Sequence, residues 1–307
     1  MFRFVLSGST RSAAEREQDL KLQIKEFLQS EALAEIFALL HTDRSRIASD
    51  YNGRAGKDGN VLETQAMSPR EELEKVRAEL YPHLAELGFF HINRPLLEKH
   101  DRILVLGGAL NVCFTRTQAA KQLKDSGSVS VDGLACYRPI HPNERRASSF
   151  SSPCDTEFGV LSDAFSGEFA LSTDNAKDDF HGDRNLNRIS CIREFSEQKD
   201  GCVFRIYAAP STEADLRRAD TGDTLRFYLE HAGIREHDSL LAITSNRYCN
   251  RQFLQLAYDI LKQEIPIDLD IIGCIPDDKI VTVITYDPFQ YLQDLISILD
   301  WIGRFGL

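Results

Sequence analysis

The sequence has no hydrophobic run that approaches the roughly 18 residues a membrane-spanning helix needs. Its N-terminal stretch from Met1 to Arg11 holds only a few apolar side chains, too few for a secretory signal. The seven cysteines are scattered and never form C-x-x-C, so we expect reduced thiols rather than a zinc site or a disulfide framework. These absences predict a cytoplasmic protein that does not bind membranes.

Basic residues are outnumbered by acidic ones, 36 to 47. The net charge of this acidic protein is -11 over 307 residues. That argues against broad nucleic-acid binding, which needs clustered Lys and Arg to neutralise phosphates, but it leaves a local basic pocket open. The length allows one large domain or two smaller ones with a sizeable core.

Helical periodicity dominates the first third of the chain. Leu20, Ile24 and Phe27 begin an apolar repeat at helix spacing within residues 13–50. A glycine-rich connection follows, and Ser68-Pro69 then predicts the start of another helix, which runs to about Leu87. We take residues 1–98 as a helical N-terminal region and residues 99–307 as a second domain.

Strand and helix patterns alternate from residue 101 onward, which predicts an α/β fold: a Rossmann-like, mostly parallel sheet flanked by helices. The polar stretch 166–200 is expected to be an irregular excursion, with a lid as one interpretation. The expected strands are 103–106 in a central position, 128–131 extending toward 135, 203–208, 240–244, 269–272 and 280–284. The expected helices are 116–125, 156–165, 221–232, 247–263 and 288–303.

Four predicted strands end in candidate ligand loops. Gly107-Gly108 follows the first, where a ligand loop and a simple tight turn are equally favoured, since neither G-x-G-x-x-G nor a P-loop is present. Arg138 follows the second, and Glu157 opens the next helix as a candidate catalytic base. A solvated Arg and a helix-dipole Glu are the alternatives.

The third and fourth tips are richer in polar groups. Arg217 and Arg218 precede a helix start that contains Thr221 and Thr224, although capping and solvated arginines explain them equally well. The fourth tip has the strongest case for ligand contact, and its alternative is again capping. It comprises Thr244, Ser245, Asn246, Arg247 and Arg251, the two arginines lying on one helix face.

Parallel strands bring such tips to one edge. We therefore expect Gly107, Glu157, Thr221 and Ser245 to converge on one cleft made locally positive by the arginines. The pair His181 and Asp183 lacks further ligands at suitable spacing, so no metal site is expected.

These motifs, taken in order, resemble the SanA/ElyC/YdcF-like family over residues 101–300. The matching positions are Gly107, Gly108, Glu157, Thr221 or Thr224, Thr244, Ser245 and Arg251. The resemblance implies a small Rossmann-like core of largely unknown function and no settled cofactor. The stretch from Asp220 to Thr224 lacks the acid and amide of the family's N-T-x-E-N motif, and Tyr248 stands near the place of its histidine.

The leading hypothesis is an enzyme or sensor for a small anionic ligand, nucleotide-like or phosphorylated. Hydrolysis or transfer at a phosphate or glycosidic bond would suit it, and S-adenosylmethionine or a nucleotide is a possible cofactor. The rival hypothesis is a non-catalytic interaction protein whose N-terminal helices recruit a protein partner. A nicotinamide-dependent dehydrogenase ranks third, because the glycine fingerprint is missing.

Overall fold

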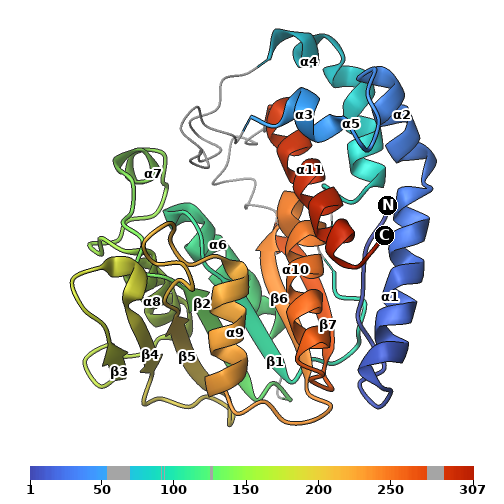
Figure 1. Ribbon diagram of the computed structural model, residues 1–307. Coiled ribbons are helices and arrows are strands. Elements are labelled where there is room, and N and C mark those ends of the chain that lie inside the picture. The colour runs from blue at the N-terminus through green and yellow to red at the C-terminus, as the bar shows by residue number, and fades with distance from the viewer. Residues whose placement is uncertain (54–69, 91, 93, 125–126, 275–286) are drawn as a thin grey trace.

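The computed structural model describes residues 1–53, 70–90, 92, 94–124, 127–274 and 287–307 (Figure 1). In these residues a seven-stranded sheet has the order β3-β4-β5-β2-β1-β6-β7. Its strands are β1 (Arg102–Leu106), β2 (Ser130–Ala135), β3 (Lys177–His181), β4 (Ser190–Glu194), β5 (Val203–Ala208), β6 (Ser239–Ser245) and β7 (Asp268–Cys274). The five neighbouring strands β5, β2, β1, β6 and β7 run parallel to one another. The predicted α/β, mostly parallel fold is thus confirmed, with β1 in a central position.

Helices cover both faces of the sheet (Figure 1). On one face lie α6 (Leu110–Leu123) and α8 (Glu157–Phe169), and on the other α9 (Thr221–His231) and α10 (Cys249–Lys262). Strand β1 shows why: Ile103 and Val105 enter the core beneath α6 and α8, whereas Leu104 and Leu106 enter the core beneath α9 and α10. A strand buried on both faces needs such an uninterrupted apolar sequence.

The N-terminal region packs against the sheet domain and shares one of its two apolar cores. Phe4 stacks on Phe253 of α10, and Leu6 forms an antiparallel bridge with Leu269 of β7. The helices here are α1 (Ala13–Leu28), α2 (Glu31–Leu39), α3 (Ile47–Tyr51), α4 (Glu71–Lys75) and α5 (Arg77–Glu86). At the C-terminal end, α11 (Pro288–Arg304) packs against α3, α5 and α10.

Several expected elements differ from the observed ones. The helix expected from residue 116 begins at Leu110, directly after the glycine pair, because Ala109 already serves as its N-cap. The helix expected from Ser68-Pro69 starts at Glu71 in the described residues. Ser68, Pro69 and the strand expected over 280–284 lie outside those residues.

The excursion over 166–200 is not irregular throughout. It contains the end of α8 and a hairpin in which β4 pairs antiparallel with both β3 and β5. The charged residues suggested an irregular loop, but they are cross-strand partners in the hairpin. Asp178 lies opposite Arg193, and their side chains form an ion pair at 2.5 Å.

All seven cysteines are free thiols. Across the described ranges, no helix combines the length and apolar character needed to cross a membrane.

Candidate functional site

The glycine loop connects β1 to α6 at the carboxyl end of the sheet. The Gly107 amide donates to the Leu134 carbonyl oxygen at 2.7 Å. A Cβ at position 107 would lie 2.8 Å from that oxygen and would collide with Glu157 Oε1, so this close approach requires glycine. The loop leads into α6, whose N-cap Ala109 supplies no side-chain hydrogen bond. The amides of the first helical turn are therefore available to an acceptor.

Arg116 lies directly beneath this loop, 2% exposed. Its guanidinium donates to the carbonyl oxygens of Leu106 and Gly107 at 2.5 and 2.7 Å, and to Ser245 Oγ at 3.1 Å. Within the described part of the chain, no carboxylate forms an ion pair with it, and its buried Nε has no hydrogen-bond partner. Burial lowers the pKa of Arg116. A cation without a paired anion thus lies where β1 and β6 end.

Sequence reasoning did not select Arg116 as a site residue. The residue stands in the interior of a helix, where an arginine normally points to solvent. The available signal was its place two helical turns after Gly108, on the side of α6 that faces the sheet.

Arg138 lies beside the glycine loop but is neutralised by the protein. It forms ion pairs with Glu157 and Glu144 at 2.5 and 2.8 Å, and it donates to the Gly108 carbonyl oxygen at 2.6 Å. Burial alone would lower the pKa of Arg138, but the adjacent carboxylates of Glu157 and Glu144 have the larger effect, so the net pKa is raised. Arg138 therefore holds Glu157 against the loop, and Glu144, in the short helix α7 (Pro142–Arg146), is a partner that the sequence did not reveal.

The third tip is mainly a helix cap. Asp220 is the N-cap of α9 and forms a reciprocal capping box with Asp223. Arg217 pairs with Asp223 at 2.5 Å, so the positive charge expected there is locally neutralised. Thr224 donates to the Thr221 carbonyl oxygen within the helix. Arg218, the other arginine of this tip, is exposed.

At the fourth tip, polar side chains connect β6 to its neighbours. Thr244 is hydrogen-bonded to Gln252, which in turn donates to Thr221 Oγ1 at 3.1 Å. Asn246 packs against Gly273 of β7, where a Cβ would collide with its backbone. Ser245 takes the expected N-cap position, but of a 3-10 turn, η3 (Asn246–Tyr248), that runs directly into α10. Neither Ser245 nor Tyr248, which precedes α10, makes a side-chain capping hydrogen bond.

The two arginines of this tip meet a carboxylate on α11. Arg247 is buried, with Nε 2.9 Å from Asp294, and it donates to Gln290 at 3.1 Å. Arg251 is more exposed, and its Nη1 lies 3.7 Å from Asp294.

The structure thus brings three of the four expected residues together: Gly107 and Ser245 share hydrogen bonds to Arg116, and Glu157 touches Gly107. Thr221 connects more remotely, through Gln252 to Thr244.

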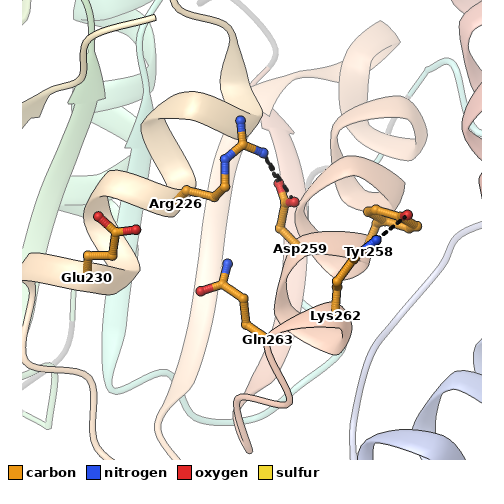
Figure 2. A pocket seen from close by; sticks show the side chains of 6 residues that line it. All are labelled: Arg226, Glu230, Tyr258, Asp259, Lys262 and Gln263. Atoms are coloured by element: carbon orange, nitrogen blue, oxygen red, sulfur yellow. Dashed lines mark hydrogen bonds and ion pairs between the residues drawn. The ribbon is translucent and has the colours of Figure 1, made fainter. Parts of the chain in front are cut away.

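A surface hollow of about 370 Å³ lies elsewhere, between α9 and α10 (Figure 2). Arg226 spans it to reach Asp259 and also pairs with Asp223, while Lys262 donates to Tyr258. Its one arginine is already paired with two carboxylates, whereas buried Arg116 pairs with none among the described residues, so we favour the ends of β1 and β6 as the site.

No family model matches the chain, and no solved structure matches it. The chain is 27% identical over 220 residues to uncharacterized protein Rv3785 and uncharacterized protein MT3893 of Mycobacterium tuberculosis, and to uncharacterized protein Mb3814 of Mycobacterium bovis. The match covers 66% of this chain and 62% of each relative, so the chain spans less than two thirds of the length of these curated relatives.

Proposed function

We propose that the protein binds a small phosphorylated or nucleotide-like anion in the crevice between the carboxyl ends of β1 and β6. The strand order reverses here, with β2 on one side of β1 and β6 on the other. Such a switch point is where open α/β sheets bind ligands. The helices that follow these strands, α6 and α10, lie on opposite faces, and neither has a side-chain cap, whereas α8 and α9 do.

Buried Arg116 is the observation that carries the proposal. A buried cation is costly unless an anion compensates it. The described carboxylates nearby are engaged by Arg138, Arg247 and Arg251, whereas Arg116 has no carboxylate partner among them. A phosphate over Gly107-Gly108 would gain the amides of α6 and the field of this guanidinium. This arrangement favours a nucleotide over S-adenosylmethionine, whose sulfonium is itself a cation.

Glu157 gives the proposed site a group for chemistry. Its Oε1 lies against Gly107, while Oε2 accepts from Arg138 at 2.5 Å. The free side of this carboxylate can accept a proton from a water or hydroxyl that attacks a ligand held by the loop. Hydrolysis or transfer at a phosphate or glycosidic bond would use it in this way. Glu157→Gln should then abolish turnover while binding persists.

The test is calorimetric titration of the protein with inorganic phosphate, AMP and ATP at constant ionic strength. Arg116→Met should weaken binding roughly 10- to 100-fold, the scale of a charge-assisted hydrogen bond. Arg16→Met is the matched control, because Arg16 is also buried and also donates to two backbone carbonyls, but in α1. Wild-type protein that binds none of these anions would contradict the proposal, as would equal losses in both variants.

We do not favour a scaffold role for the N-terminal helices. Leu20 and Phe27 of α1 are buried in the core that α1 shares with α10, and α3 and α5 pack on α11, which leaves less surface for a protein partner. Membership of the SanA/ElyC/YdcF-like family stays a proposal, supported by the close packing of Gly107 and Glu157, two residues that carry the resemblance.

A further inference from the structure

A second cationic side chain borders the same crevice. Arg251 lies in the first turn of α10, and its side chain is 18% exposed. Its Nη1 is 3.7 Å from Asp294, too long for a hydrogen bond, and its buried Nε has no hydrogen-bond partner in the described residues. Arg251 is therefore held much more loosely than Arg138 and retains donors for a ligand.

Tyr248 links this arginine to Arg116. Its ring centre lies 4.7 Å from the Arg251 guanidinium carbon and 4.5 Å from that of Arg247. Arg116 donates to Ser245 Oγ at 3.1 Å, three residues before Tyr248. Two guanidiniums thus lie against the Tyr248 ring, and the third bonds to the same short segment at the end of β6. Asp294 is the carboxylate that the described residues supply to Arg247 and Arg251, and Arg247 holds it more closely.

We propose that the ligand carries two directly linked anionic groups, as in a diphosphate or a diphosphate ester. One group lies over Gly107-Gly108 at the N-terminus of α6, above Arg116. The other lies at the N-terminus of α10, beside Arg251. Strands β1 and β6 are neighbours, and at the end of β6 Ser245, which accepts from Arg116, is only three residues before Tyr248, whose ring lies against Arg251. Two anionic groups placed over adjacent strands need a short link, which a sugar ring between them would not provide.

This inference rests on the proposed function but is tested separately. Binding of inorganic phosphate and of pyrophosphate is measured by calorimetry, without divalent metal. The wild type should bind pyrophosphate at least tenfold more tightly than phosphate. Arg251→Met should reduce this preference to less than threefold. The control Arg304→Met, which removes an exposed arginine with a similarly long contact to Asp300, should keep it.

The outcomes separate the two proposals. Wild-type protein that binds phosphate but shows no preference for pyrophosphate overturns the inference and leaves the proposed function in place. The same holds if Arg251→Met retains the preference. Failure of the wild type to bind either anion overturns both. Should Arg251→Met fail to fold, Arg251→Lys decides: it keeps the charge but loses the planar fork, and a preference that does not fall at least threefold refutes the role of Arg251.

Discussion

Asp132 lies in the middle of β2, and we expect its carboxylate to destabilise the folded protein when it is ionised. The side chain is fully buried against α9, where its Oδ2 accepts from Ser130 Oγ at 2.5 Å and Tyr228 Oη at 2.9 Å. Oδ1 has no hydrogen-bond partner among the described residues. Burial raises the pKa of Asp132 and outweighs the opposing effects of Ser130, Tyr228 and Arg102.

We therefore expect Asp132→Asn to raise the free energy of unfolding at pH 7 by about 1 kcal/mol. Removing a buried charge recovers several kcal/mol. Two charge-assisted hydrogen bonds become weaker, and a buried amide group is left without a partner. Each of these three changes lowers the free energy of unfolding by about 1 kcal/mol, which offsets most of the gain. No cation loses its main partner, because Arg102 keeps Asp238 at 2.7 Å and Arg205 keeps Glu194 at 2.5 Å.

The pH dependence has a definite sign. Because the pKa of Asp132 is raised in the folded protein, the folded protein binds a proton more readily than the unfolded chain. The contribution of Asp132 to the free energy of unfolding is therefore favourable below the pKa of the unfolded state. It is lost as the pH rises through the pKa of the folded state. The advantage of Asp132→Asn should shrink as pH falls from 7 toward 4. Urea denaturation at several pH values measures this. A loss of more than about 2 kcal/mol at pH 7 would show that the ionised carboxylate stabilises the fold.

Asp238 provides the opposite control. Burial raises its pKa, but hydrogen bonds from Arg102 and Arg235 outweigh burial and hold the pKa below its ordinary value. Asp238 therefore stabilises the folded protein above the pKa of the unfolded state, and this stabilisation is lost as the pH falls through the pKa of the folded state. Asp238→Asn should cost about 3 kcal/mol at pH 7, because it leaves Arg102 buried without its carboxylate, and the cost should decrease in acid.

Two further changes test local geometry. Gly107→Ala should weaken phosphate binding at least tenfold in calorimetry, because the new Cβ displaces Glu157 from the loop; unchanged affinity would show that this packing does not matter to the site. Asp220→Ala should lower the free energy of unfolding by about 1 kcal/mol through loss of the α9 capping box, whereas Asp220→Asn, which can still cap, should cost much less in urea denaturation.

The sequence located the loops well because a parallel sheet forces strand ends to one edge. Gly107, Glu157 and Ser245 are close together for that reason. It could not say which arginines keep their charge available. Arg138 and Arg217 look like ligand groups in the sequence, but Glu144 and Asp223 neutralise them, and only the packing of α7 and α9 brings those acids within reach. Arg116 was missed because its burial depends on how α6 is rotated against β1 and β6.

The bridge between Leu6 and Leu269 bears on how the chain folds. It joins residues from opposite ends of the sequence, and Arg3 reinforces it by pairing with Asp270. Closing so long a loop costs more entropy than pairing β1 with β2, and contacts between distant residues slow folding. We expect the β1–β2–β5 part to become protected from hydrogen exchange first during refolding, and the amide of Leu6 to gain protection last, when the two ends of the chain meet.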